Sequence, residues 1–199
     1  MNIQQAILLD LPFPIESRRL VIRPFMAGDG PALYEALVES VEELKIWNPW
    51  ARCSLTPEGA EENVRRFYAD YILRQALHFG IYRRHRLVGV CGLARFKWEI
   101  PSCSLGYWLR STEYKKGYAT EAANALTRYA FDQLKIRRLV IECDDENLKS
   151  AAVAERLFFT LEGKGVGLAP PKDHSNELRT GRVYVRFDTK NLPKLSVSW

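Results

Sequence analysis

Two lysines and a glycine lie between a β-rich run and a helical pattern within residues 106–123. Gly117 allows the backbone to turn where a Cβ atom would collide. The amides of residues 116–120 then fall at the N-terminus of the helix, where unpaired N–H groups carry roughly half a positive charge and bind phosphate. Lys115 and Lys116 add charge beside these amides. The first chemistry that the sequence indicates is therefore the binding of a pyrophosphate group.

Other phosphate-binding motifs are excluded by their spacing. The sequence contains no P-loop run that ends in Gly-Lys-Ser or Gly-Lys-Thr, and no Gly-x-Gly-x-x-Gly follows the first strand of a βαβ unit. Residues 163–167 are rich in glycine, but no helical pattern follows them and two prolines come next. We therefore predict that this segment is a flexible turn.

Residues 114–119, Tyr-Lys-Lys-Gly-Tyr-Ala, resemble the loop that binds the pyrophosphate of acetyl-CoA in the GNAT superfamily of N-acetyltransferases. The family pattern is Gln/Arg-x-x-Gly-x-Gly/Ala, and Tyr114 replaces its first residue. The RimJ/RimL-type branch, which acetylates the N-termini of ribosomal proteins, usually has an aromatic residue there, followed by Gly-Tyr-Ala-Thr-Glu-Ala. Residues 117–122 match that run.

The resemblance implies acetyl-CoA as co-substrate and no metal. In this family two central strands separate after residues that match 107–110, and their free backbone groups bind the pantetheine arm like an added strand. The amide near Leu109 would polarise the thioester carbonyl. The alternative is an ordinary strand–helix connection without a ligand. The cofactor-binding residues implied are Trp108, Leu109, Arg110, Lys115, Lys116, Gly117, Tyr118, Ala119, Thr120, Asn147 and Ser150.

Residues 147–159 resemble a second family motif, Asn-x-x-Ser-x-x-Val-x-Glu-Lys-x-Gly-Phe. Asn147 would hold the pantetheine amide, or it would serve only as a helix N-cap. The tyrosine that protonates the thiolate in many members is replaced by Ala154, so the resemblance points to Ser150 as the catalytic group that hydrogen-bonds the sulfur. The alternative is a serine that only caps the helix. Phe158 stands where the family usually has glycine.

A general base is not obvious, because Ser104 stands where relatives often have glutamate. An α-amine with a pKa near 8 is about one-tenth neutral at pH 7, whereas less than about 0.1% of a lysine is neutral. The missing base is therefore tolerable for an N-terminal amine and costly for lysine. Glu42, Glu43 and Glu99 could act through water, or they could be solvated surface charges.

Residues 46–51, Ile-Trp-Asn-Pro-Trp-Ala, resemble the Trp-x-Pro-Trp segment that lines the acceptor side in the ribosomal branch. This resemblance implies that Trp47 and Trp50 bind the substrate, together with Tyr107 on the strand before the pyrophosphate loop. The alternative is that the tryptophans fill the core, which is easier to accept for Trp50 than for Trp47, since Trp47 lies in a proline-bearing loop.

Composition and length indicate one globular domain over residues 1–199, with a core at about 18–187, an N-terminal arm and a short C-terminal tail. No apolar run approaches about 18 residues, and the N-terminus lacks a signal-peptide pattern. The chain is therefore expected to be cytoplasmic and not to bind membranes. The net charge of +5 suits an anionic ligand, although solubility alone could explain it. The basic residues are dispersed, so direct nucleic-acid binding is not expected.

The four cysteines, Cys53, Cys91, Cys103 and Cys143, show no Cys-x-x-Cys spacing, and three lie in predicted strands. We interpret them as buried free thiols of a reducing compartment; a nucleophilic cysteine is the alternative. The three histidines, His78, His85 and His174, are too scattered to predict a metal site.

Periodicity and capping residues predict the order of elements. Pro24 makes a central place in the sheet unlikely for the first strand. Residues 163–181 are expected to form a long loop. The order resembles the α/β (α+β) GNAT fold, a mixed sheet of about six or seven strands splayed at the middle and flanked by about four helices. The predicted strands are 19–25, 78–82, 87–96, 102–109, 139–143, 159–162 and 182–187, and the predicted helices are 29–40, 56–73, 119–134 and 150–158.

The function that the resemblance implies is direct acetyl transfer from acetyl-CoA to a primary amine, with the N-terminus of a protein such as a ribosomal protein as acceptor. A small amine, such as an antibiotic or polyamine, is the second enzymatic hypothesis. A non-catalytic CoA-binding protein and a basic nucleic-acid-binding module are the other classes. Trp199, at the end of an apolar tail, hints at a contact, so that the chain is a monomer or a homodimer.

Overall fold

The computed structural model describes residues 6–171 and 177–199. Its strands form one sheet in the order β7-β8-β6-β5-β4-β3-β2-β1-β9. The strands are β1 (Ile15–Ser17), β2 (Val21–Pro24), β3 (Leu77–Arg83), β4 (Arg86–Lys97), β5 (Ser102–Leu109), β6 (Arg138–Asp144), β7 (Thr160–Ala169), β8 (Arg179–Arg186) and β9 (Val197–Ser198). The helices are α2 (Gly30–Trp47), α3 (Pro57–Leu73), α4 (Tyr118–Asp132) and α5 (Leu148–Arg156), with 3-10 turns at Pro49–Arg52 and Ser111–Glu113.

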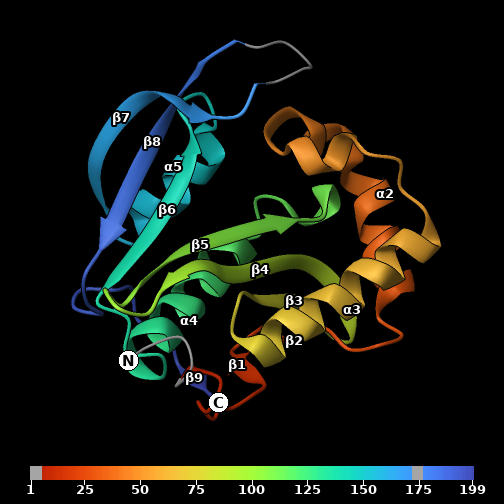
Figure 1. The fold of residues 1–199 in the computed structure, drawn as a ribbon, viewed down its shortest axis with the longest axis horizontal. Helices are drawn as coiled ribbons and strands as arrows, with labels where there is room; N and C mark the ends of the chain where they lie inside the picture. Colours follow the sequence, from red (N-terminus) through yellow and green to blue (C-terminus); the bar gives the residue numbers. More distant parts are fainter. Residues whose placement is uncertain (1–5, 172–176) are drawn as a thin grey trace.

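Helices cover both faces of this sheet (Figure 1). Successive side chains of a strand point to opposite faces. In β4, Cys91 accordingly packs in the cluster that includes α4 and α5, whereas Val90 packs in the cluster formed with α2 and α3. The buried face of α4 is rich in alanine, including Ala122 and Ala123 at 0% exposure. Such small side chains allow the helix axis to approach β4 and β5 closely.

The sheet separates into two arms between β5 and β6. These parallel strands pair only from Ser102 with Arg138 to Ser104 with Val140. Beyond that point β6 continues its pairing with β8, and β5 continues its pairing with β4. Figure 1 shows the two strands diverging, with α5 beside one arm and α2 and α3 beside the other. The splayed mixed sheet with four flanking α-helices in the described residues confirms the predicted fold class.

The sheet contains more strands than predicted because both chain ends add to it. β1 pairs with β2 and with β9, so the segments expected to lie outside the core meet each other at one sheet edge. Trp199 packs edge-on against Tyr129 of α4, with ring centroids 5.8 Å apart. This contact within the chain explains the apolar tail without a second copy.

Two predicted elements differ in the structure, one in its place in the sheet and one in its length. The first long strand is interior rather than peripheral, because β2 lies between β1 and β3. Pro24 is tolerated there because β1 pairs only as far as Ile22, so no neighbour needs the missing N–H at Pro24. Helix α2 runs to Trp47 instead of ending near residue 40, and Leu44 continues its buried face.

The prediction for residues 163–181 was largely wrong. Strand β7 extends to Ala169 and β8 begins at Arg179, so most of the predicted loop is an antiparallel ribbon. The glycines of β7 are typical of a turn, and nearly all of the strand is exposed. The sequence therefore shows no hydrophobic alternation that would predict a strand here. Gly167 has φ +79° beside a register shift, which is where a glycine in a strand is expected.

Candidate active site

Helix α4 begins at the gap between β5 and β6 with an uncapped N-terminus. Gly117 is its N-cap, with φ +81°, a left-handed conformation that favours glycine. The Glu121 amide donates to the Gly117 carbonyl at 3.0 Å, and no side chain caps the preceding turn. The N–H groups of residues 118–120 are therefore directed out of the helix, as an anion site requires.

A buried acid in the first turn of α4 is neutralised from the N-terminal arm. The Glu121 carboxylate accepts hydrogen bonds from Ser17 Oγ at 2.8 Å and Arg19 Nε at 2.6 Å. The same guanidinium donates to the Lys116 carbonyl at 3.0 Å. Arg19 thus offsets a negative charge near the expected phosphate site and fixes the loop. Sequence reasoning missed this residue, because it lies 102 positions from Glu121.

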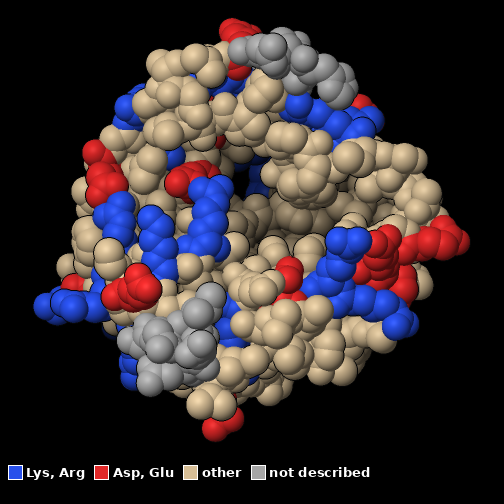
Figure 2. Space-filling view, in the orientation of Figure 1, with Lys and Arg blue, Asp and Glu red and all other residues tan. Residues whose placement is uncertain are grey.

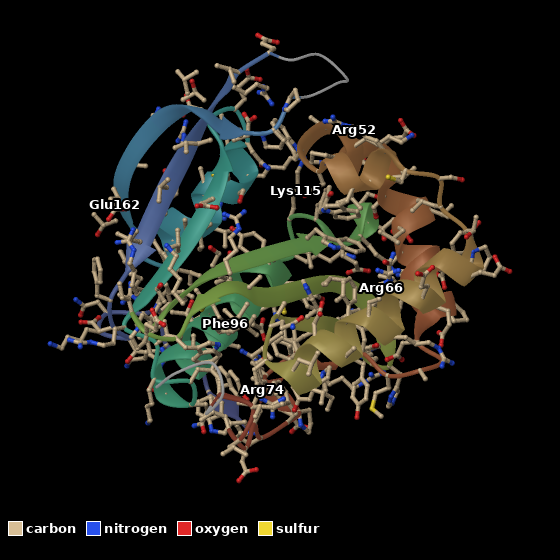
Figure 3. All side chains as sticks on the ribbon, viewed as in Figure 1. Arg52, Arg66, Arg74, Phe96, Lys115 and Glu162 are labelled. Carbon is tan, nitrogen blue, oxygen red and sulfur yellow. The ribbon has the colours of Figure 1, made fainter. Side chains whose placement is uncertain are left out.

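The two loop lysines differ in their surroundings. Lys116 Nζ lies 2.9 Å from a carboxylate oxygen of Glu113, whose side chain is only 7% exposed. Lys115 has φ +63° and is exposed. Figure 3 places Lys115 at the far end of β5, between the arm that carries β6 and the arm that carries α2. Lys115 is therefore the more available cation for a bound anion.

On the edge of β5 that faces the gap, the N–H and C=O groups of every second residue have no strand partner past Ser104 among the described residues. The Arg110 amide donates to the Val88 carbonyl of β4 at 2.9 Å. Because the backbone groups of successive strand residues point alternately to the two sides, those of Tyr107 and Leu109 face away from β4. This side has no strand partner past Ser104 among the described residues. The Leu109 amide, which the sequence resemblance implied, is thus directed into the gap.

The Arg110 side chain is directed toward α2 and is buried there, so it is not available to a bound cofactor. Its side chain is 1% exposed and donates from Nε to the Leu87 carbonyl at 2.7 Å. One guanidinium nitrogen lies 2.8 Å from carboxylates of both Glu35 and Glu39 on α2. Its amide and carbonyl are also used, by β4 and by the Glu113 amide. The structure therefore assigns Arg110 to the support of the β5 end.

The second helix N-terminus at the gap carries the predicted serine. Asn147 Oδ1 accepts a hydrogen bond from the Ser150 amide at 3.1 Å, which makes Asn147 the N-cap of α5. The Tyr107 hydroxyl lies 3.1 Å from the Ser150 carbonyl and 3.2 Å from Ser150 Oγ. Burial raises the pKa of the nearby Cys143 thiol, despite a hydrogen bond with Ser150. At the gap, Tyr107 of β5 and Ser150 of α5 are therefore in contact.

The base of α5 is held by an ion pair that the sequence did not reveal. Arg179 at the start of β8 donates to Asp144 Oδ1 at 2.9 Å, and both side chains are less than one-tenth exposed. The Asp144 carbonyl in turn accepts the Asn147 amide at 3.0 Å. This pair fixes the turn between β6 and α5, and thereby the position of Ser150.

The predicted acceptor side lies at the open end of the arms. Trp50 is 47% exposed, so the interpretation of this tryptophan as core is wrong. Its ring centroid lies 6.2 Å from that of Trp108, whereas Trp47 is half-buried at the end of α2. Arg52 donates to the Pro171 carbonyl at 2.7 Å and so joins the two arms. Figure 2 shows the surface hollowed between them.

The three candidate bases are separated by the fold. Glu42 pairs with Lys45 at 2.9 Å on the exposed face of α2, with a side chain that is 80% exposed. Glu99 precedes β5, and the strand from Ser102 to Leu109 spans about 23 Å at ~3.3 Å per residue, so Glu99 lies at the opposite end of β5 from Leu109. Glu43 is half-buried, and its charge adds to burial in raising the pKa of Tyr114 in the pyrophosphate loop. Of these three candidates, Glu43 is therefore the one whose charge reaches the loop before α4.

The thiols and histidines show no further catalytic arrangement. Burial raises the pKa of Cys91 and Cys103, which opposes a thiolate at either position. Cys53 is exposed, which corrects the expectation that all four thiols are buried. The part of the chain described by the structure contains no group of three potential metal ligands from His, Cys, Asp and Glu. His174 lies outside the described residues.

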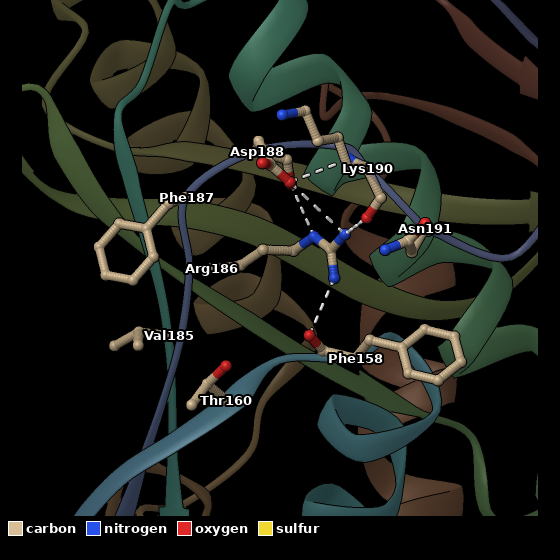
Figure 4. Close-up of a pocket in the computed structure, with 8 residues that line it drawn as sticks. All are labelled: Phe158, Thr160, Val185, Arg186, Phe187, Asp188, Lys190 and Asn191. Carbon is tan, nitrogen blue, oxygen red and sulfur yellow. Dashed lines mark hydrogen bonds and ion pairs between the residues drawn. The ribbon is translucent and has the colours of Figure 1, made fainter.

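A pocket near the C-terminal tail is not part of this site. It has a volume of about 290 Å³ and surrounds Arg186 near the C-terminal tail (Figure 4). The guanidinium donates to the carbonyls of Leu157, Phe158 and Asp188 at 2.6–2.9 Å, and it also bonds the Lys190 carbonyl. Because backbone carbonyls already occupy its donors, Arg186 joins chain segments rather than binding an anion.

A mixed sheet that opens between two parallel strands, with two helix N-termini at the opening, is the architecture of acetyltransferases that use CoA thioesters. The family model described as an acetyltransferase (GNAT) domain matches residues 19–160. The chain belongs to this GNAT acetyltransferase family and is an acetyl-CoA-dependent N-acetyltransferase. No helix within the described residues is long and apolar enough to span a membrane.

Comparisons with individual proteins agree with this assignment. The chain is 32% identical over 131 residues to the ribosomal-protein-serine acetyltransferase of Escherichia coli (strain K12), covering 66% of this chain and 73% of that protein. The structure of RimL, a ribosomal L7/L12 α-N-protein acetyltransferase in complex with coenzyme A, has a TM-score of 0.80 at 23% identity and covers 91% of this chain and 99% of that chain. The microcin C7 self-immunity acetyltransferase MccE, in complex with acetyl-CoA and AMP, has a TM-score of 0.79 at 21% identity and covers 86% and 93%.

Proposed function

We propose that this enzyme transfers the acetyl group of acetyl-CoA to the N-terminal α-amine of a protein, such as a ribosomal protein. The observation that carries the proposal is the gap between β5 and β6, where the uncapped N-terminus of α4 and the Leu109 amide face one space. The relative from Escherichia coli, which is named for acetylation of ribosomal-protein serine, supports the choice of acceptor.

The residues present suit acetyl-CoA. The amides of residues 118–120 and Lys115 would hold its pyrophosphate, and the exposed edge of β5 would pair with the pantetheine arm. A Cβ atom at Gly117 would meet only an Arg19 nitrogen, at 3.4 Å, so the loop leaves open space where phosphate would lie. Asn147 is the N-cap of α5, and its side-chain N–H groups would bind a pantetheine amide.

The chemistry is a direct attack on the thioester. The amine nitrogen forms a bond with the carbonyl carbon while the Leu109 amide stabilises the developing oxyanion. The carbon–sulfur bond then breaks, and the proton lost by nitrogen ends on the CoA sulfur. Ser150 supplies a hydrogen bond to the departing sulfur. Glu43, through water, takes up the amine proton before it reaches the thiol.

An α-amine fits this site better than a lysine side chain. The site offers one half-buried carboxylate, Glu43, and no strong base on β5, where Ser104 stands. An α-amine has a pKa near 8 and needs little help to lose its proton, whereas a lysine near 10.4 needs roughly 3 kcal/mol more. Trp50 and Trp108 would flank the acceptor chain at the mouth of the cleft.

The test measures CoA release from acetyl-CoA with a thiol reagent. The acceptors are peptides with a free serine or alanine N-terminus, the same peptides with a blocked N-terminus and an internal lysine, and small amines such as spermidine. A Cys53→Ser background removes the exposed thiol that would react with the reagent. We expect turnover with free N-termini and at least a hundredfold less with the blocked peptides.

Gly117→Glu and Gly117→Gln form a matched pair of variants. Both side chains have the same size and carry the same backbone strain at φ +81°, but only glutamate places a negative charge at the expected phosphate site. We expect Gly117→Glu to raise the acetyl-CoA KM at least tenfold above that of Gly117→Gln. Turnover confined to small amines would replace the acceptor in our proposal. Equal KM values for the two variants would place the cofactor elsewhere.

A further inference from the structure

We propose that Tyr107 is a positioning residue for the reaction, and that its hydroxyl orients Ser150 toward the leaving sulfur. This inference rests on the proposed function, in which Ser150 hydrogen-bonds the CoA thiolate. It assigns to Tyr107 a different task from contact with the acceptor, which is what the sequence resemblance implied.

The geometry joins the two side chains across the gap. Tyr107 comes from β5 and Ser150 from the first turn of α5, so the pair spans the point where the arms separate. The phenol oxygen lies 3.1 Å from the Ser150 carbonyl and 3.2 Å from Ser150 Oγ. Among the described residues, the Tyr107 hydroxyl forms hydrogen bonds only with these two atoms.

The direction of the hydrogen bonds between Tyr107 and Ser150 depends on which groups carry a proton. Burial raises the pKa of Tyr107, so its hydroxyl stays protonated and acts as a donor near neutral pH. A carbonyl can only accept, so the single phenol proton is directed to the Ser150 carbonyl, and the 3.2 Å contact with the phenol oxygen fixes the place of Ser150 Oγ. Ser150 also hydrogen-bonds the Cys143 thiol at the wall of the gap, so its hydroxyl already has a sulfur partner beside Tyr107. On binding, the sulfur of CoA would take the place of Cys143 as the acceptor of the serine proton.

The transfer step balances without a proton from tyrosine. The amine nitrogen bonds to the acetyl carbon, the carbon–sulfur bond breaks, and the nitrogen's proton ends on sulfur. Ser150 stabilises the sulfur's charge with a hydrogen bond, and Tyr107 keeps its own proton throughout. Loss of the tyrosine hydroxyl should therefore affect the rate of the chemical step and leave the binding of acetyl-CoA nearly unchanged.

The experiment is a double-mutant cycle with Tyr107→Phe and Ser150→Ala, measured as kcat and KM with an N-terminal peptide. We expect Tyr107→Phe to lower kcat about tenfold, as for loss of one orienting hydrogen bond, with the acetyl-CoA KM within twofold. In the Ser150→Ala background the same change should lower kcat less than twofold. A tyrosine with only a structural role would lower kcat equally in both backgrounds.

Tyr184→Phe is the matched control, because the Tyr184 hydroxyl donates to Glu155 at 2.9 Å and lies on neighbouring β8. We expect its kcat to stay within twofold of wild type. Unchanged kcat in Tyr107→Phe, or equal losses in both backgrounds, would overturn the inference while the proposed function stands. A tenfold rise in the acetyl-CoA dissociation constant of Tyr107→Phe would make it a binding residue. Absence of turnover on every amine would overturn the proposed function and this inference together.

Discussion

Phe158 occupies a left-handed backbone position directly after α5, where the sequence pattern of the family has glycine. Its φ is +55°, and its side chain is 63% exposed at the rim of the pocket around Arg186 (Figure 4). The position is held because Arg186 donates to the Phe158 carbonyl at 2.9 Å and the Phe159 amide donates to Ala154 at 3.0 Å. The backbone thus keeps the turn that glycine would make, at the cost of strain.

We expect Phe158→Gly to stabilise the protein by about 0.5–1 kcal/mol. Left-handed backbone costs a residue with a Cβ atom about 1–2 kcal/mol, and the added flexibility of glycine offsets about 0.5–1 kcal/mol of the gain. The measurement is urea unfolding of the variant and wild type. Phe158→Ala is the control, because it keeps the Cβ atom and should change stability by less than about 0.5 kcal/mol. A less stable glycine variant would show that the phenyl ring contributes packing.

At the scale of elements, a charge network joins α2 to the end of β5 and to the pyrophosphate loop. Arg110 pairs with Glu39, and Glu39 also accepts a hydrogen bond from Thr112 Oγ1 at 2.5 Å. Arg86 connects Glu39 with Glu113, which in turn holds Lys116. These residues fix the strand end that carries the Leu109 amide, so the network supports the candidate site from the α2 side.

We expect Arg110→Met to destabilise the protein by about 2–4 kcal/mol. The change removes a buried cation and leaves the Leu87 carbonyl and the glutamates of α2 without their shared donor. Urea unfolding gives the loss. Arg86→Met is the control, since the Arg86 side chain is 47% exposed and its pairs should contribute at most about 1 kcal/mol. Equal losses in the two variants would mean that burial does not set the strength of this network.

At the scale of the whole molecule, partly buried ion pairs give stability a dependence on pH. Burial opposes ionisation of Asp29, but the Arg23 guanidinium and the Met26 amide prevail and lower the pKa of its carboxyl. Burial likewise opposes ionisation of Glu39, and the hydrogen bonds from Thr112 and Arg110 lower its pKa. A carboxyl whose pKa is lower in the folded state stabilises the protein above its unfolded pKa of about 4, and loses that contribution as pH falls through the folded pKa.

We therefore expect the free energy of unfolding to decline as pH falls below about 4.5, with these carboxyls contributing no slope between pH 6 and 8. The measurement is urea unfolding at pH 7, 5 and 3.5. Asp29→Asn should be less stable than wild type at pH 7 and should lose less stability between pH 7 and 3.5, because one linked proton is removed. An equal loss in both proteins would show that the Arg23–Asp29 pair does not carry this dependence.

The sequence by itself determined the features that neighbouring residues control. The turn at Gly117, the starts of α3 and α4 and strand β5 were all readable, because glycine conformation, capping and alternation act within a few residues. Strand β7 could not be predicted from its neighbouring residues in this way. An exposed, glycine-rich edge strand carries no hydrophobic period, and its partner β8 supplies the order.

Only the tertiary structure decided which distant groups share the site. Arg19 and Glu121 are 102 residues apart, and Tyr107 and Ser150 are 43 apart, so no local pattern links either pair. Arg110 was expected at the cofactor because it follows β5, yet strand alternation directs its backbone to β4 and burial directs its side chain to α2. The physical reason is that strand register and side-chain packing depend on contacts across the whole sheet. A sequence motif contains information only about residues that are close together in the chain.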